Sequence, residues 1–189
     1  MKVIQLHQEE KQLIMLAVEN NRQAQQQIYA KFSSKMLSVC RQYIKDIHHA
    51  EDVMITGFMK VFTNLKNFEH KGSFEGWIRR IMVYECIDFL RVKKNNFNHQ
   101  DIEDVTISEN ESVYEMEDFS VDDIQNMIDN LPDGYKMVFN LYAIEGYKHQ
   151  EIAEMLKISE GTSKSQLSHA RKLLQQQITE LKKKLNGTK

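Results

Sequence analysis

Through most of the chain, segments in which apolar side chains recur every three to four positions alternate with short polar breaks. This period is that of an amphipathic helix. It predicts helical segments in residues 9–20, from about Gln23 to Tyr43, in residues 53–68, and from Phe74 to about Lys94. The side chains expected in the core from the second and third segments are Ile28, Phe32, Met36, Leu37, Cys40, Val53, Phe58, Val61, Phe62 and Leu65.

Two polar breaks carry residues that invite a functional interpretation. His48 and His49 lie in the break at 46–52 and are interpreted as loop residues rather than metal ligands. The break at 67–73, NFEHKGS, contains a glycine and ends in a serine that can cap the next helix, so it is predicted to be a loop. Trp77 shares helical spacing with Ile81 and Met82 and is therefore predicted to be a core residue.

The second half of the chain follows a segment of different composition. Residues 95–121 combine Asn, Ser and acids with few periodic apolar positions, which is typical of a solvated linker. Beyond it, residues 124–131 are predicted to form a short helix, Pro132 to lie in the first turn of another, and Gly146 to follow that helix. The predicted fold class is all-α, with two small helical domains, 1–94 and 122–189, joined by the flexible acidic linker 95–121.

The charge of the chain is divided unevenly along its length. The formal net charge is -2, but residues 101–123 hold ten acids and no Lys or Arg. The remaining 166 residues carry 25 basic and 17 acidic side chains, a net charge of +8. Two basic domains flanking an acidic connector are therefore expected, and a basic surface is the electrostatic signature of a nucleic-acid binder.

Several classes of protein are disfavoured by what the sequence does not contain. No apolar run is long enough to span a bilayer and the first residues do not form a signal peptide, so the cytoplasm is the expected location. Cys40 and Cys86 are far apart and are predicted to be buried reduced thiols, with no metal site and no cofactor. No nucleotide-binding, zinc-protease or serine-hydrolase motif occurs, so we expect no catalytic residue and no enzyme activity.

The segment from residue 147 onward is the most informative. A short helix at 149–156, with Ile152, Ala153 and Leu156 on its buried side, is followed by a three-residue turn and a second helix capped by Ser159. Ile158 is expected to fill the angle between them. This pattern predicts a helix-turn-helix whose second helix enters a DNA major groove.

Polar and basic side chains follow at the start of that second helix. Residues 157–189 hold eight Lys or Arg and two acids, which suits a phosphate backbone. The residues predicted to contact DNA from this helix are Glu160, Thr162, Ser163, Lys164, Gln166, Arg171 and Lys172.

Two pairs of segments resemble a known family. AEDVMITGFMKVFTNLKNFE (50–69) and SFEGWIRRIMVYECIDFLRVKK (73–94) resemble region 2 of the extracytoplasmic-function (ECF) sigma factors of the sigma-70 family. LPDGYKMVFNLYAIEGYKHQEIAEML and SEGTSKSQLSHARKLL resemble region 4 of the same family. The resemblance implies an alternative sigma factor that binds core RNA polymerase and promoter DNA, recognises the minus-35 element with region 4 and melts the minus-10 element with region 2.

The resemblance also implies roles for region 2 residues. Contact with the polymerase clamp helices would come from the AEDVMITGF stretch, with Asp52, Thr56 and Lys60 on its polar face. Contact with the minus-10 element would come from Phe68, His70, Lys71, Arg79, Arg80, Tyr84, Arg91, Lys93 and Lys94. Many family members have Asn where this chain has Tyr84, close to the captured minus-10 base. Members of the family commonly have an anti-sigma factor, which the sequence does not identify.

Two other classes of DNA-binding protein share the helix-turn-helix. A dimeric repressor or activator would bind a symmetric site tightly without polymerase. A response regulator would need a receiver of alternating strands and helices, whereas residues 1–94 show helical periodicity throughout. The order of the two family-like regions favours the sigma factor over both.

Overall fold

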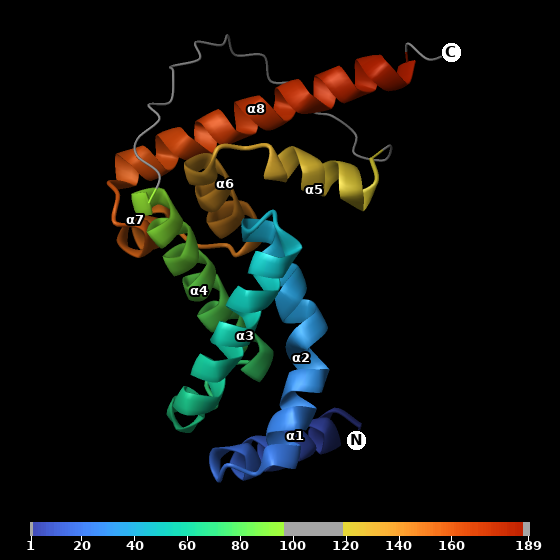
Figure 1. Ribbon diagram of the computed structural model, residues 1–189, viewed down its shortest axis with the longest axis vertical. Coiled ribbons are helices and arrows are strands. Elements are labelled where there is room, and N and C mark those ends of the chain that lie inside the picture. Colours follow the sequence, from blue (N-terminus) through green and yellow to red (C-terminus); the bar gives the residue numbers. More distant parts are fainter. Residues whose placement is uncertain (1, 97–118, 187–189) are drawn as a thin grey trace. The chain divides into compact units, whose positions relative to one another are not determined.

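The computed structural model describes residues 2–96 and 119–186, and every regular element within these ranges is a helix. Residues 1–92 and 93–189 form two separate compact units (Figure 1). The first unit contains α1 (Lys2–Val18), α2 (Arg22–Tyr43), α3 (Ile47–Asn64) and most of α4 (Phe74–Asn96). The second contains α5 (Val121–Asp129), α6 (Asp133–Phe139), α7 (His149–Leu156) and α8 (Glu160–Asn186). The expected all-α class is confirmed.

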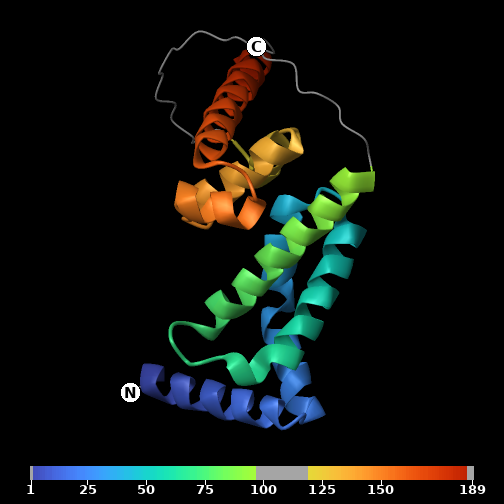
Figure 2. The ribbon, with the colours of Figure 1, turned by 90° about the vertical axis from the view of Figure 1, so that its left-hand side faces the viewer.

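In the first unit, α1 runs across one end of a bundle formed by α2, α3 and α4 (Figure 2). The sequence period predicted most of its interior: of the ten core side chains expected in α2 and α3, all but Leu37 and Phe62 are buried, and those two are half-buried. Cys40 and Cys86 are both buried thiols, as predicted. The rings of Phe32 and Phe74 meet edge to face at 5.7 Å and join α2 to α4.

Helix ends were predicted less well than helix faces. The first helix begins at Lys2 rather than residue 9 and ends at Val18, where Asn20 takes a left-handed φ of 63°. The third begins at Ile47 rather than residue 53, because the Asp46 side chain accepts a hydrogen bond from the His49 backbone N–H (2.9 Å). His48 and His49 therefore lie in the first turn of α3, and their interpretation as loop residues was wrong.

A single glycine lets α3 and α4 approach closely. A Cβ built on Gly57 of α3 would overlap Sδ of Met82 on α4 and lie 3.0 Å from its Cε. Ser73 caps α4 as predicted, since its Oγ accepts from the backbone N–H of Gly76 (3.0 Å). Between α3 and α4 the chain forms a short 3₁₀ turn, Leu65–Asn67, and then the loop that was predicted at 67–73.

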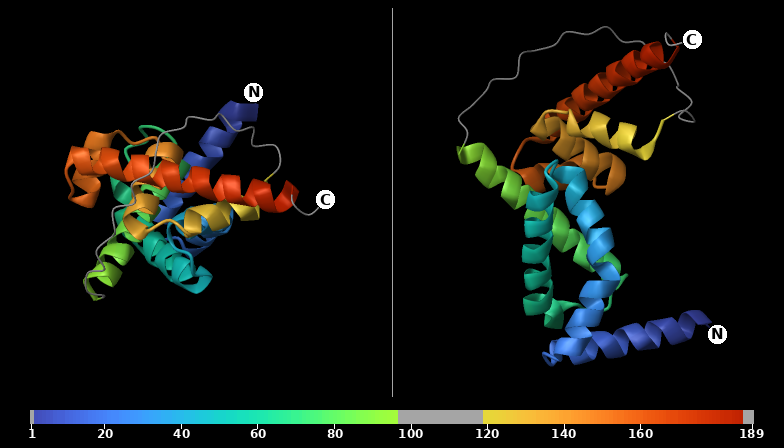
Figure 3. Two further views of the ribbon diagram at one scale, coloured as in Figure 1. Left: turned by 90° about the horizontal axis from the view of Figure 1, so that it is seen from above. Right: turned by 45° about the vertical axis from the view of Figure 1, so that its right-hand side comes forward.

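In the second unit, α8 extends over 27 residues, and α5, α6 and α7 pack against it (Figure 3). Ser120 and Asp123 form a capping box at the start of α5, and hydrogen bonding by Ser120 lowers the pKa of the Asp123 carboxyl. Pro132 lies immediately before α6 rather than within its first turn. Gly146 follows a π-helical turn, Asn140–Ile144, with a positive φ of 77°.

An ion pair lies inside this unit. Nζ of Lys136 on α6 is 3.5 Å from Oδ1 of Asp129 at the end of α5, and the two side chains are 5% and 1% exposed. Gln125 donates a further hydrogen bond to the same carboxylate oxygen (3.3 Å). A charge buried away from water is costly unless an opposite charge lies beside it, so each member of this pair needs the other.

Removal of one partner should therefore be costly. Asp129→Ala should lower the unfolding free energy of the second unit by about 3–5 kcal/mol, because it leaves the Lys136 charge buried without its counter-ion. Hydrogen exchange of the α6 amides in the full chain measures this. The control Glu10→Ala, which breaks the exposed pair Lys31–Glu10, should cost the first unit less than about 1 kcal/mol. Equal losses would contradict the interpretation, and the double change Asp129→Leu with Lys136→Met should restore most of the stability.

Candidate functional site

The helix-turn-helix has the spans that the sequence predicted. α7 occupies His149–Leu156, and Lys157 ends it in the left-handed conformation (φ 56°). Ser159 caps α8, since its Oγ accepts from the backbone N–H of Thr162 (2.9 Å). The buried side of α7 differs in part from the prediction: Ile152 and Met155 are buried, whereas Ala153 and Leu156 are half-buried. The α7 start lacks a side-chain cap from Lys148, and Glu151 accepts from the Lys148 N–H instead (2.7 Å).

Two of the predicted DNA-contacting side chains of α8 are exposed and basic. Lys164 pairs with Glu160 one turn earlier (2.7 Å), and a hydrogen bond and the charge of Lys164 hold the pKa of Glu160 below its usual value. Arg171 is exposed, with its guanidinium 5.7 Å from the ring centroid of Tyr142. Lys172 is half-buried. Lys164 and Arg171 can therefore meet phosphates while the helix keeps its packing.

Other predicted contacts of α8 point toward the protein. Ser163 is fully buried and its Oγ lies 2.9 Å from Nδ1 of His149, so in this structure the side chain joins α7 to α8. Its assignment as a DNA contact stays a prediction. Thr162 is engaged with the capping serine, its Oγ1 2.8 Å from Oγ of Ser159. Gln166 lies against the first turn of α6, where a Cβ on Gly134 would be 3.2 Å from its Nε2.

In the first unit, the residues of the loop before α4 that were predicted to contact the minus-10 element differ in exposure. Phe68 is buried and packs against Phe74 and Trp77, with centroids 5.1 and 5.5 Å away. It is therefore a core residue in this structure, and its assignment to base contact stays a prediction. His70 is exposed in the left-handed conformation (φ 56°), and Lys71 is exposed and pairs with Glu69 (2.7 Å).

The predicted side chains of α4 are spread along the helix. Arg80 is exposed and lies over the ring of Tyr84, 5.9 Å from its centroid, while Arg79 is half-buried. Arg91 pairs with Asp88 (2.9 Å). The side chains of Lys93 and Lys94 lie outside the described part of the structure.

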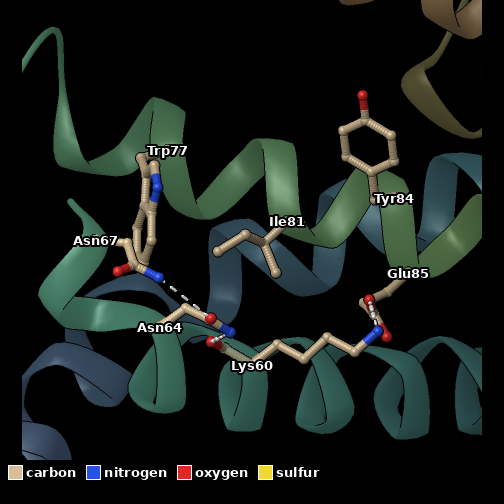
Figure 4. Close-up of a pocket in the computed structure, with 7 residues that line it drawn as sticks. All are labelled: Lys60, Asn64, Asn67, Trp77, Ile81, Tyr84 and Glu85. Atoms are coloured by element: carbon tan, nitrogen blue, oxygen red, sulfur yellow. Dashed lines mark hydrogen bonds and ion pairs between the residues drawn. The ribbon is translucent and has the colours of Figure 1, made fainter. Parts of the chain in front are cut away.

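A pocket of about 330 Å³ opens between α3 and α4 (Figure 4). Trp77 lies at one end, Ile81 near the middle, and Glu85 with Lys60 at the other end. The complete lining is Lys60, Asn64, Asn67, Trp77, Ile81, Tyr84 and Glu85. Trp77 was predicted to be a core residue; it packs on Phe74 at 5.9 Å but is half-exposed and forms a wall of the pocket.

Two of the lining groups form an ion pair. Lys60 donates to Oε1 of Glu85, and the Glu85 side chain is 9% exposed. Lys60 was assigned to polymerase contact, but its ammonium is held at this pocket. Asn64 and Asn67 supply amides, and the Asn67 Nδ2 lies 3.5 Å from Oδ1 of Asn64. Sequence reasoning missed Asn64, Asn67, Ile81 and Glu85, because the pocket joins residues about twenty positions apart.

A neighbouring face of α3 is apolar and exposed. Ile55 is 50% exposed and Met59 is 65% exposed. They share one side of the helix with Asp52 and Thr56, which are also exposed, at spacings of three and four residues. The Thr56 hydroxyl donates to the backbone carbonyl of Asp52 (2.9 Å). This mixed face, Asp52, Ile55, Thr56 and Met59, has the composition of a protein-binding surface.

The described residues, 2–96 and 119–186, contain neither a metal-ion cluster nor a membrane-spanning helix. Within these ranges no three His, Cys, Asp or Glu side chains gather where they could hold a metal ion. Within the same ranges no helix combines the length and the apolar character that a membrane crossing needs.

Two family models match the chain, one in each unit. The model of sigma-70 region 2 matches residues 28–96, and the model of sigma-70 region 4 matches residues 121–174. The two models together cover more than half of the chain. The first covers most of α2, all of α3 and α4, and the pocket, and the second contains the helix-turn-helix.

Curated relatives and a solved structure agree with the models. The chain is 29% identical over 163 residues to the ECF RNA polymerase sigma factor SigW of Bacillus subtilis, covering 79% of this chain and 86% of SigW. It is 24% identical over 169 residues to the ECF RNA polymerase sigma-E factor of Haemophilus influenzae, covering 82% and 87%. The fold is similar, with a TM-score of 0.53 and 19% identity, to the sigma factor RpoE of Bartonella quintana solved with its anti-sigma factor NepR, covering 82% of this chain and 96% of RpoE. The chain belongs to the ECF group of the sigma-70 family and is an alternative sigma factor for promoter-specific transcription initiation.

Proposed function

We propose that this sigma factor acts through three surfaces: α8 on the minus-35 duplex, the pocket between α3 and α4 on the minus-10 strand, and the exposed face of α3 on core polymerase. The observation that supports the proposal most strongly is the pocket. It is large enough for a nucleobase and is lined by an aromatic wall and polar groups, in the unit that matches region 2. These functions place the protein in the cytoplasm, where polymerase and DNA meet.

The α8 surface reads the minus-35 element in the major groove. Its helix-turn-helix places the N-terminal turns of α8 outward, with Lys164 and Arg171 exposed. Both have local partners, Glu160 and Tyr142, which preorganise the side chains without burying them. Phosphates can replace the Glu160 carboxylate, because an exposed ion pair is weak.

The pocket holds one base of the minus-10 element after it leaves the duplex. Extrusion of a base costs stacking and pairing, which the protein repays by stacking and by hydrogen bonds to the base edge. Trp77 offers the aromatic face, and the polar lining offers the hydrogen bonds. Arg80, His70 and Lys71, all exposed nearby in sequence, supply donors and positive charge for the strand on either side.

The exposed face of α3 binds the clamp helices of the largest polymerase subunit. Ile55 and Met59 provide apolar area, and Asp52 and Thr56 provide the polar rim. Exposed methionine is suited to such a role because its flexible thioether adapts to a partner. We further propose an anti-sigma partner that covers this face, since the similar RpoE was solved with the anti-sigma factor NepR.

Transcript mapping tests the function as a whole. The purified chain is mixed with core RNA polymerase and genomic DNA, and the 5′ ends made only in its presence are sequenced. We expect new start sites that share two upstream elements. If no start depends on the chain and it instead binds a symmetric site without polymerase, the dimeric repressor is the better reading.

Core binding tests the α3 face. Met59→Ser should weaken binding to core polymerase about tenfold or more, because it removes the most exposed apolar side chain of the surface. Met15→Ser is the matched control, since Met15 on α1 is 64% exposed and outside the proposed face. Titration of labelled protein with core enzyme measures both. Equal affinities for the two variants would rule out Met59 as a core contact.

Salt dependence tests the α8 surface. Lys164→Ala should reduce the slope of log affinity against log salt for minus-35 duplex DNA by about one, because one phosphate contact is lost. Arg171→Ala should act similarly. Lys183, which is exposed on α8 beyond the family match, provides the control Lys183→Ala, for which the slope should stay close to that of the parent chain. Fluorescence anisotropy at several salt concentrations gives the slopes, and an unchanged slope in Lys164→Ala would remove that contact.

A further inference from the structure

One end of the pocket between α3 and α4 is formed by charged groups rather than by amides. Glu85 is buried, and its Oε1 accepts a hydrogen bond from Nζ of Lys60. The Glu85 side chain passes close to α3: its Cγ lies 3.7 Å from the position that a Gly57 Cβ would occupy. Figure 4 shows the pair beyond Ile81, at the opposite end of the pocket from Trp77. A base stacked near Trp77 would thus direct one edge toward Glu85.

The chemistry of that end is asymmetric. A carboxylate can only accept hydrogen bonds, and Lys60 engages one of its two oxygens. The carboxylate belongs to the buried wall, whereas the Lys60 side chain is 50% exposed. The inner group is therefore an acceptor, and the donor beside it lies nearer to solvent. A base that enters must present a donor to the inner wall.

Cytosine and thymine differ in the hydrogen-bonding groups that they present to this wall. Cytosine carries an exocyclic N4 amino group next to the ring acceptor N3, and a glutamate commonly accepts from that amino group. Thymine carries the carbonyl O4 at the same corner, and its only donor, N3–H, lies between two carbonyl oxygens. If the carboxylate accepts from N3–H, the Lys60 ammonium can donate to only one of the two flanking oxygens. The other oxygen then faces the carboxylate as acceptor against acceptor, a cost that the N4 amino group of cytosine does not incur. The Lys60 ammonium can donate to N3 of cytosine.

We propose that the Lys60–Glu85 pair makes this pocket select cytosine over thymine in the captured minus-10 base, with Glu85 accepting from the N4 amino group. The inference rests on the proposed base capture. It assigns base selection to a carboxylate on α4 and to a lysine on α3, in addition to the Tyr84 position. Tyr84 is 38% exposed and lies under Arg80, so it borders the pocket while Glu85 closes its end.

The test compares two bases that differ only at this edge. Thymine and 5-methylcytosine have the same ring and methyl group, so size and stacking are matched. Each is placed in turn at every position of the minus-10 non-template strand, taken from the mapped start sites, and binding of the strand to the holoenzyme is measured. We expect one position at which 5-methylcytosine is preferred about tenfold.

Variants assign that preference to Glu85. Glu85→Gln should abolish the preference at the same position, because an amide can turn to donate or to accept. Lys60→Gln also removes the ion pair but keeps the carboxylate, and its side-chain amide can still donate to N3, so it should retain the preference. A purely structural role of the pair predicts that the two variants behave alike. Glu10→Gln, which neutralises the exposed Lys31–Glu10 pair, should leave binding and preference unchanged.

Each outcome has a defined meaning. No position with a preference for 5-methylcytosine, a preference for thymine, or a preference that survives in Glu85→Gln would overturn the inference. The wild-type measurement alone can do so, which protects the test if a variant is unstable. Failure of the wild-type holoenzyme to bind any minus-10 strand would instead count against the proposed function, and with it against the inference.

Discussion

The close approach of α3 and α4 at Gly57 is the constraint on which the first unit depends. Met82 occupies the space that any larger residue at position 57 would need. Beside this contact Glu85 of α4 reaches Lys60 of α3, and Trp77 and Ile81 line one pocket with Asn64 and Asn67. The two helices that meet at Gly57 and Met82 thus also carry the base-sized pocket. Glycine costs a helix about 1 kcal/mol relative to alanine, and here the loss is offset by packing that a Cβ would prevent.

Helical periodicity gave the fold class and most of the core, because the requirement to bury one face acts on every turn of a helix. It failed at the helix ends, where single hydrogen bonds decide. Asp46 starts α3 within a stretch that looks like a polar break. Likewise Phe68 lies in a loop, where an aromatic residue suggests a ligand contact, yet the ring is buried against Phe74 and Trp77. Sequence alone does not show whether a loop aromatic folds back.

The candidate site was predictable in its location but not in its chemistry. Spacing placed Ser163 near the leading end of the recognition helix, but His149, fourteen positions earlier, engages its hydroxyl in the interior. Spacing also placed Lys60 on a polar face, whereas its partner Glu85 lies on another helix. The sequence could have predicted the exposed apolar face of α3, because Ile55 and Met59 are apolar residues at the same helical spacing as Asp52 and Thr56. An apolar pair on an otherwise polar face indicates a partner.

The acidic partners of the basic side chains bear on how such a factor avoids DNA at the wrong time. Lys71, Arg91 and Lys164 each hold an exposed carboxylate within 3 Å. Exposed pairs contribute little to stability, so a phosphate can displace each carboxylate at small cost. Displacing a carboxylate still lowers the net free energy that a single phosphate contact contributes. The ten acids of residues 101–123 repel DNA over a longer range. We therefore expect a surface of this kind to bind DNA weakly by any single face. Binding to promoter DNA should become strong only when several faces are engaged together, with both regions held on polymerase.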